Sequence, residues 1–243
     1  MRHNRFVTPA LILACGGSVV LGAPPVVSTF DTDDEGWSTD KDARNFRWEG
    51  EGGNPGGNVA ADDVGTGQYW RFDAPAPYLG DKSSSYGESI SYDIRQLGTV
   101  GTVTNQPDVR LTGAGITLEY RFGVAPGGDW SSFSVQIAAG IGWTRAGSPA
   151  TEADIRAVLA DLTHLSIRGE YRVGADSAAL DNVSMGRGCA ADFDGNGLLN
   201  FFDVSAFIAA YNNADPAADL AAPFGTFNFF DISAYIAEYN AGC

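Results

Sequence analysis

The sequence predicts a mainly β protein: an antiparallel β-sandwich with one helix, followed by a small α-helical module. Three observations support this fold class. Segments with apolar residues at every second position recur through residues 26–185, separated by stretches rich in glycine and proline. A helical pattern interrupts them once, at residues 151–162. Near the C-terminus, residues 200–212 recur almost unchanged as residues 228–240, each copy with helical apolar spacing.

The predicted strands place alternate side chains toward one core. In residues 89–95, for example, Ile90 and Ile94 share one face. Short strands of this kind between turn-forming stretches favour an antiparallel sandwich. Further strands are expected at residues 116–122, 133–137 and 165–173. For the single helix, Thr151 is the expected N-cap, and Asp154 completes a variant of the capping box.

Composition narrows the function. Hydrophobic residues make up 44% of the 243 residues and aromatic residues 12%, which supports a real core rather than disorder. A net charge of -15 argues against nucleic acid or an anionic membrane surface as a partner. His164 is the only histidine beyond residue 3, which argues against a zinc site. No Ser/His/Asp or Cys/His arrangement indicates a catalytic nucleophile, so no catalytic residue is predicted.

Residues 1–23 are predicted to form an export signal. Arg2 and Arg5 make a basic start, and the apolar region behind them is too short and too broken to span a bilayer. No transmembrane span is therefore expected. Two outcomes stay open: cleavage after Ala23, which releases a secreted protein, or lipid attachment at Cys15 in a lipobox-like sequence, which holds the protein at the cell surface.

Residues 192–203 carry the strongest functional pattern. Oxygen-bearing side chains stand at the first, third, fifth, ninth and twelfth positions, with glycine at the sixth, as in a twelve-residue calcium loop. The loop holds three carboxylates and no Lys or Arg. Because two carboxylates ~4 Å apart repel by roughly 4 kcal/mol, a divalent cation is expected among them; a solvated turn is the alternative. The predicted Ca²⁺ ligands are Asp192, Asp194, Asn196, the carbonyl of Leu198, Asn200 through a water, and Asp203.

The second copy of the repeat has a loop that departs from this pattern. Asp219, Asn228 and Asp231 are kept, but the segment is one residue longer, and Ala222 and Phe224 stand near expected ligand positions. A weaker, carbonyl-based or empty second calcium site is therefore predicted. The helix after each loop has an apolar stripe, and the two stripes are expected to bury against each other.

Cys189 and Cys243 bracket the repeated segment. A disulfide between them would join the two ends of the module and stabilise it by roughly 4 kcal/mol on the loop-entropy model. Pairing is expected in an exported protein, and two free thiols are the alternative.

With its duplicated loop–helix units and its Gly-Cys end, the tail at residues 189–243 resembles a type I dockerin. Dockerins are calcium-binding modules that dock onto a cohesin-type receptor. The resemblance implies a cohesin-like receptor, or another surface or scaffold partner, for this tail. Phe201-Phe202 and Phe229-Phe230 stand where dockerins often carry small hydroxyl residues that contact the cohesin. We expect these phenylalanines to lie in the core of the module instead.

Residues 26–185 carry a second set of motifs. They include Phe30-Asp-Thr-Asp-Asp-Glu-Gly-Trp37, Gly52-Gly-Asn-Pro-Gly-Gly57, Tyr69-Trp-Arg-Phe-Asp-Ala-Pro75 and Leu180-Asp-Asn-Val183. With these motifs the region resembles a laminin B domain (laminin domain IV), a jelly-roll β-sandwich of galactose-binding-like shape. The resemblance implies an extracellular, non-enzymatic module.

Glu119 and Glu170 are expected on outward-facing strand rows. Such rows are usually solvated faces with weak ion pairs; the functional interpretation is a polar floor for a sugar. The candidate stacking platforms are Trp48, Trp70 and Trp143. The same two glutamates are the only candidates for the paired carboxylates of a glycosidase.

A structural calcium ion is also predicted within the sandwich. In jelly-roll binding modules, an acid on the first strand and one on the last often share an ion, and Asp31 and Asp181 stand at those places.

The sequence thus predicts a secreted, non-catalytic binding protein in two parts. The sandwich presents a face for a glycan or protein ligand, and the calcium-dependent tail attaches it to a surface or scaffold. A carbohydrate-active hydrolase or carbohydrate-binding protein that carries the same tail is the alternative, and a purely structural envelope protein is the third interpretation.

Overall fold

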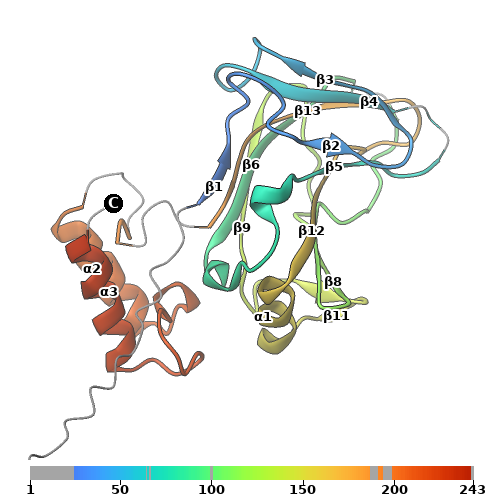
Figure 1. The fold of residues 1–243 in the computed structure, drawn as a ribbon. Coiled ribbons are helices and arrows are strands. Elements are labelled where there is room, and N and C mark those ends of the chain that lie inside the picture. Colours follow the sequence, from blue (N-terminus) through green and yellow to red (C-terminus); the bar gives the residue numbers. More distant parts are fainter. Residues whose placement is uncertain are drawn as a thin grey trace, which may run out of the picture.

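In the computed structural model, the described residues form two antiparallel β-sheets and three α-helices, arranged as Figure 1 shows. The structure describes residues 25–63, 65, 67–98, 101–186, 191–193 and 199–241. The predicted mainly β, antiparallel sandwich is confirmed. Within these residues no helix is both long enough and apolar enough to cross a membrane.

The first sheet has its C-terminal strand at the centre. Its strands are β1 (Val26–Ser28), β3 (Ala43–Glu49), β4 (Asn58–Asp63), β6 (Ser89–Gln96), β9 (Ser131–Gln136) and β13 (Ser177–Met185). Their order is β3-β4-β13-β6-β9, with β1 also paired to β13, and every pairing is antiparallel. Strand β13 therefore joins segments from the beginning and the middle of the chain.

The second sheet has its central strands contributed by the middle of the chain. Its strands are β2 (Ser38–Thr39), β5 (Arg71–Asp73), β7 (Val109–Gly113), β8 (Ile116–Tyr120), β10 (Thr144–Arg145), β11 (Ser148–Pro149) and β12 (Leu162–Arg168). Their order is β11-β10-β8-β7-β12-β5-β2, again antiparallel throughout.

One core lies between the sheets. Ile90 and Ile94 of β6, predicted on one face, are fully buried and belong to the same cluster as Leu111, Leu118 and Ile167 of the second sheet. Large aromatic side chains bury a large apolar area each. The largest fully buried side chains are Trp70, Tyr78, Tyr92, Tyr171, Phe30 and Phe72.

The helix of the sandwich, α1 (Glu152–Ala160), begins as predicted. Thr151 Oγ1 accepts a hydrogen bond from Asp154 N (3.2 Å), and Asp154 Oδ2 accepts one from Thr151 N (3.0 Å), so both arms of the capping box are present. Ile155 and Val158 are fully buried in the sandwich core.

The tail contains the two expected helices, α2 (Phe201–Asn212) and α3 (Phe229–Ala241). They meet through Phe207 and Tyr235, whose rings stack with centroids 4.0 Å apart. The segment between them touches the sandwich, since Gln136 Nε2 donates to Asp215 Oδ1 (3.0 Å). Gly87 leaves room for this contact: a Cβ there would lie 2.5 Å from the carbonyl oxygen of Pro216.

Candidate functional sites

The first tail loop has its C-terminal half anchored on α2. The carboxylate of Asp203 is fully buried and accepts a hydrogen bond from Asn200 N (2.8 Å). Asn200 Oδ1 in turn accepts one from Phe202 N (2.8 Å), so both predicted ligands also cap the helix. Asp194, Asn196 and Leu198 lie outside the described residues, as do Cys189, Cys243, Cys15 and residues 1–23. The calcium site, the disulfide and the export signal stay predictions.

The second loop repeats the same hydrogen bonds. Asp231 is fully buried and accepts hydrogen bonds from Asn228 N (2.8 Å) and Ala221 N (2.9 Å). Asn228 Oδ1 accepts one from Phe230 N (2.8 Å). The duplication seen in the sequence therefore extends to the hydrogen bonds that cap the helix after each loop.

An arginine from the sandwich reaches into this second loop. Arg156 of α1 bonds Asp219 Oδ2 through Nη2 (2.9 Å) and Glu152 Oε1 through Nε (2.7 Å). Its guanidinium also lies over the rings of Tyr86 and Phe224, 3.8 and 4.3 Å from their centroids. Burial raises the pKa of Asp219, and the bond from Gly225 N and the charge of Arg156 oppose that rise. A positive charge thus already lies beside the first predicted ligand of the second site.

The expectation that the paired phenylalanines lie in the tail's core is wrong. Each pair occupies the first turn of its helix, directly after the N-cap, whereas the helix–helix contact forms further along at Phe207 and Tyr235. The pairs therefore point to solvent. Phe201, Phe202, Phe229 and Phe230 are 75%, 68%, 72% and 61% exposed.

Two of the three predicted stacking platforms are also corrected. Trp70 is fully buried and Trp143 is 2% exposed, so both belong to the core and neither ring can receive a sugar. Trp48 on β3 is 40% exposed, with its indole N–H bonded to the carbonyl of Phe30 (2.7 Å). Of the three, only Trp48 stays a candidate.

The two predicted glutamates lie in different surroundings. Glu119 on β8 bonds Arg110 (3.0 Å) and lines an open pocket of about 300 Å³ with Thr117 and Arg145. Glu170, expected on a solvated row, is only 3% exposed, since the end of β12 at Arg168 and the residues that follow it are buried on both faces. Burial raises the pKa of Glu170 to about 7, and the negative charges of Asp63 and Asp176 add to the rise.

Asp31 and Asp181 are brought against one glycine-rich loop. A Cβ on Gly56 would lie 2.4 Å from Asp31 Oδ1, and one on Gly53 would lie 2.7 Å from Asp181 Oδ2. Asp181 accepts hydrogen bonds from the backbone N–H groups of Asn54 (2.5 Å) and Asn182 (2.7 Å). Burial raises its pKa to about 6 against these bonds, with Asp93 and Asp31 adding to the rise. A calcium ion shared by Asp31 and Asp181 stays a prediction.

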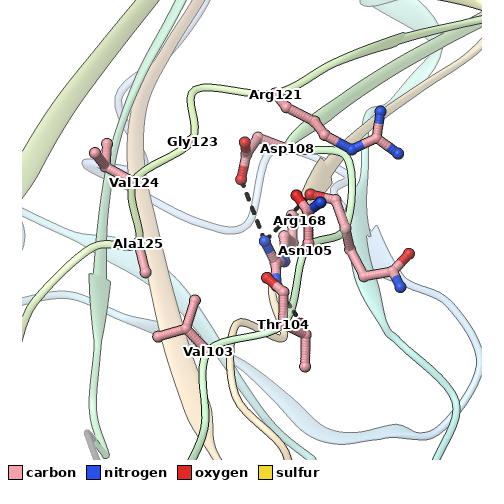
Figure 2. A pocket seen from close by; sticks show the side chains of 10 residues that line it. Val103, Thr104, Asn105, Asp108, Arg121, Gly123, Val124, Ala125 and Arg168 are labelled. Carbon is pink, nitrogen blue, oxygen red and sulfur yellow. Dashed lines mark hydrogen bonds and ion pairs between the residues drawn. The ribbon is translucent and has the colours of Figure 1, made fainter. Parts of the chain in front are cut away.

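A pocket that the sequence did not indicate lies beside β7 and β12 (Figure 2). Its volume is about 260 Å³, and the ion pair between Arg168 and Asp108 (3.5 Å) lies in its floor. Exposed Val103 and Val124 stand at its rim. The lining comes from residues 103–108, residues 121–125 and Arg168, which are separate in the sequence, so no local motif marks it.

The model of the family "Laminin B (Domain IV)" matches residues 69–195, about half of the chain. The chain belongs to the laminin B family. The match begins just before β5 and ends before α2, so both tail helices lie beyond it.

Relatives of this laminin B chain are much longer proteins. It is 30% identical over 142 residues to laminin subunit alpha-3 of Homo sapiens, a match that covers 54% of this chain and 4% of that protein. It is 29% identical over 119 residues to the basement membrane-specific heparan sulfate proteoglycan core protein of Mus musculus, covering 48% of this chain and 3% of that protein. The chain therefore matches only a small part of each relative.

Two solved structures are similar in fold alone. The L4b domain of human laminin alpha-2 aligns over 53% of this laminin B chain and 77% of that domain, with 15% identity and a TM-score of 0.47. A family 11 carbohydrate-binding module of a cellulosomal cellulase of Clostridium thermocellum aligns over 66% of this chain and 92% of that module, with 14% identity and a TM-score of 0.44.

Proposed function

We propose that this laminin B protein is an extracellular, non-catalytic binding protein that is attached to a protein receptor through its calcium-dependent, dockerin-like tail. The observation that carries the proposal is the exposure of the two phenylalanine pairs, Phe201-Phe202 and Phe229-Phe230. An extracellular location agrees with the predicted export signal and with the basement membrane named for one relative.

The phenylalanine pairs have the properties of binding anchors. Large apolar side chains that face water in a group mark interaction surfaces, and aromatic anchors dominate the energy of protein interfaces. Both pairs directly follow a helix cap made by a predicted calcium ligand, Asn200 or Asn228. Because these asparagines hold the first turn of each helix, ordering of the loop by the cation would also fix the orientation of the phenylalanines.

Calcium is assigned to the first loop. This loop carries three acids, Asp192, Asp194 and Asp203. The second loop repeats the cap hydrogen bond that the carboxylate of Asp203 accepts. In the second loop the guanidinium of Arg156 supplies the positive charge beside Asp219, so a second ion is not required there. One strong calcium site in the tail is therefore expected.

The test uses the full chain and a panel of purified cohesin-type receptor domains. Wild type is expected to bind a panel member in calcium and to lose it in chelator. Replacing Phe201 and Phe202 with serine is expected to weaken binding at least tenfold, since an aromatic anchor contributes on the order of 2 kcal/mol. Val124→Ser and Val173→Ser, which change exposed apolar residues of the sandwich, are the matched controls.

Unchanged receptor binding after all four phenylalanines are replaced would refute the docking surface. Calcium titration calorimetry of the same variants separates the two parts of the proposal. The serine variants are expected to keep the calcium ion of the tail, whereas Asp203→Asn is expected to lose that ion together with the receptor.

A glycan ligand for the sandwich is the second candidate, supported by the pocket that Glu119 lines with Thr117 and Arg145. Carboxylate, hydroxyl and guanidinium groups at the mouth of one open pocket are suited to the hydroxyls of a sugar. A glycan array tests it: Glu119→Gln is expected to remove a signal that Glu49→Gln, a change on β3, leaves in place. Turnover of a bound glycan that is lost in Glu119→Gln would support the hydrolase instead.

A further inference from the structure

Three buried acids from distant parts of the chain meet at one end of the sandwich. Asp42 directly precedes β3 and Asp63 ends β4, where Ala43 pairs with Asp63 across the first sheet. Glu170 follows β12 of the second sheet. One oxygen from each of the three carboxylates lies within 4.8 Å of the others. The three residues are 9%, 3% and 3% exposed.

The carboxylate of Glu170 accepts a backbone hydrogen bond from Trp70, but only one of its two oxygens is satisfied. Its Oε2 is buried and has no hydrogen-bond partner. Among the residues that the structure describes, no Lys, Arg or His forms an ion pair with Glu170. A buried carboxylate oxygen is stable only when it is neutralised or hydrogen-bonded. Because Glu170 is only 3% exposed, its unbonded oxygen indicates a missing positive ligand.

The surroundings of Glu170 supply further negative charge. Asp63 and Asp176 both act on it electrostatically, and Asp176 forms no ion pair with any described residue either. Backbone N–H groups meet the other two acids of the cluster, with Gln68 N donating to Asp42 (3.2 Å) and Gly65 N to Asp63 (2.7 Å). These amides orient the carboxylates but do not cancel their charge.

We propose that Asp42, Asp63 and Glu170 form a structural calcium site that joins the two sheets of the sandwich. The donors are all carboxylate oxygens, with no imidazole or thiolate, which selects a hard cation over zinc or copper. Calcium is favoured over magnesium because it accepts irregular, partly bidentate carboxylate shells, whereas magnesium requires a regular octahedron and retains several waters. A divalent ion turns the mutual repulsion of the three acids into attraction.

This site does not depend on the function of the tail. It would reinforce the β3–β4 end of one sheet against the segment that follows β12, where Asp63 N already donates a hydrogen bond to the carbonyl of Asp176 (2.9 Å). It is also separate from the pair Asp31 and Asp181, which lies against the Gly52–Gly57 loop. No local spacing links the three acids, which explains why the sequence did not indicate them.

The test is calorimetric titration of Ca²⁺ into the full, chelator-stripped chain, with thermal unfolding of the sandwich as a second readout. Glu170→Gln keeps the shape of the side chain and removes its charge. It is expected to bind one calcium ion fewer than wild type, or to bind it at least tenfold more weakly, and to show a smaller calcium-induced rise of the sandwich's midpoint. Asp203→Asn and Asp181→Asn are the controls for the tail and for the other acid pair, and both are expected to keep this ion.

Wild-type stoichiometry and a wild-type calcium-induced rise in Glu170→Gln would overturn the proposal. So would a wild-type sandwich whose midpoint changes with pH but not with calcium, because the acids would then share a proton rather than an ion. If Glu170→Gln does not fold, Asp42→Asn takes its place with the same expectations.

Discussion

The sandwich and the tail are both held together by aromatic side chains, but in very different amounts. The sandwich encloses one continuous core with six large aromatic side chains fully buried, Trp70 and Phe72 among them. In the described tail the buried apolar residues that pack together are Phe207, Ala218 and Tyr235. Small cores rarely stabilise a fold without metals, disulfides or contacts to other parts. We therefore expect the tail to need its predicted cation and its contacts with the sandwich, whereas the core of the sandwich is large enough to maintain its fold.

The two regions also differ in how the charges of their buried acids are compensated. In the tail, Asp203 and Asp231 are buried under backbone amides that cap the helices, and Asp219 has Arg156. In the sandwich, Glu170 and Asp181 are buried without an ion pair from the described residues. A chain with net charge -15 thus places part of its excess negative charge inside, where charge needs compensation.

The largest effect is expected from the sandwich core. Phe72→Ala removes a fully buried ring that packs edge-on against Trp70, with centroids 5.0 Å apart. It is expected to lower the free energy of unfolding of the sandwich by about 4 kcal/mol. Chemical denaturation followed by tryptophan fluorescence measures this. Val124→Ala, at a side chain 62% exposed, should change it by less than about 0.5 kcal/mol.

The tail's small core offers the next largest effect. Phe207→Ala removes the ring that stacks on Tyr235 and is expected to destabilise the tail by about 3 kcal/mol. Because the tail has little other core, we expect it to unfold while the sandwich remains folded. Amide hydrogen exchange resolves the two regions. An equal loss of protection in both regions would show that they unfold as one unit, which would contradict a separately unfolding tail.

The contact between the two regions is tested at Arg156. Arg156→Ala leaves Asp219, whose side chain is 2% exposed, without its cation, and is expected to destabilise the tail by about 2 kcal/mol. Arg156→Lys keeps the charge but cannot reach Asp219 and Glu152 together. The stability of its tail should therefore lie between that of wild type and that of Arg156→Ala. Proteolysis between the sandwich and α2 is the measurement. Full resistance to proteolysis in Arg156→Ala would contradict this role.

The smallest effect concerns pH. His164 on β12 pairs with Asp73 (3.1 Å), and the hydrogen bond that its Nε2 donates to that carboxylate raises the pKa of the imidazole. A raised pKa means that the folded state binds the proton more tightly, so the stabilisation is full below about pH 6.5 and disappears as the pH rises through the raised value. The side chain is 46% exposed, so the effect should stay below about 1 kcal/mol. Sandwich stability of wild type and His164→Gln, compared from pH 5 to 8, isolates it; the described tail has no histidine and should not respond.

Local patterns predicted much of this fold. The alternation at Ile90 and Ile94, the Thr151 cap and the repeated helices all follow from residues within one or two turns of each other, and all are present. Predictions about exposure were less accurate. Trp70 and Trp143 lie in the core, and the phenylalanine pairs lie on the surface. Sequence periodicity predicts which face of an element a residue occupies, but not what packs against that face.

The sequence by itself determined the fold class, the caps and the oxygen-rich loops, since these depend on backbone preference and side-chain chemistry over a short stretch. Only the tertiary structure decided that Arg156 meets Asp219, that Glu170 is withdrawn from water, and that Asp42 and Asp63 lie beside it. The physical reason is distance along the chain. Charges that are tens to more than a hundred residues apart interact strongly only after the two sheets close and exclude the water between them.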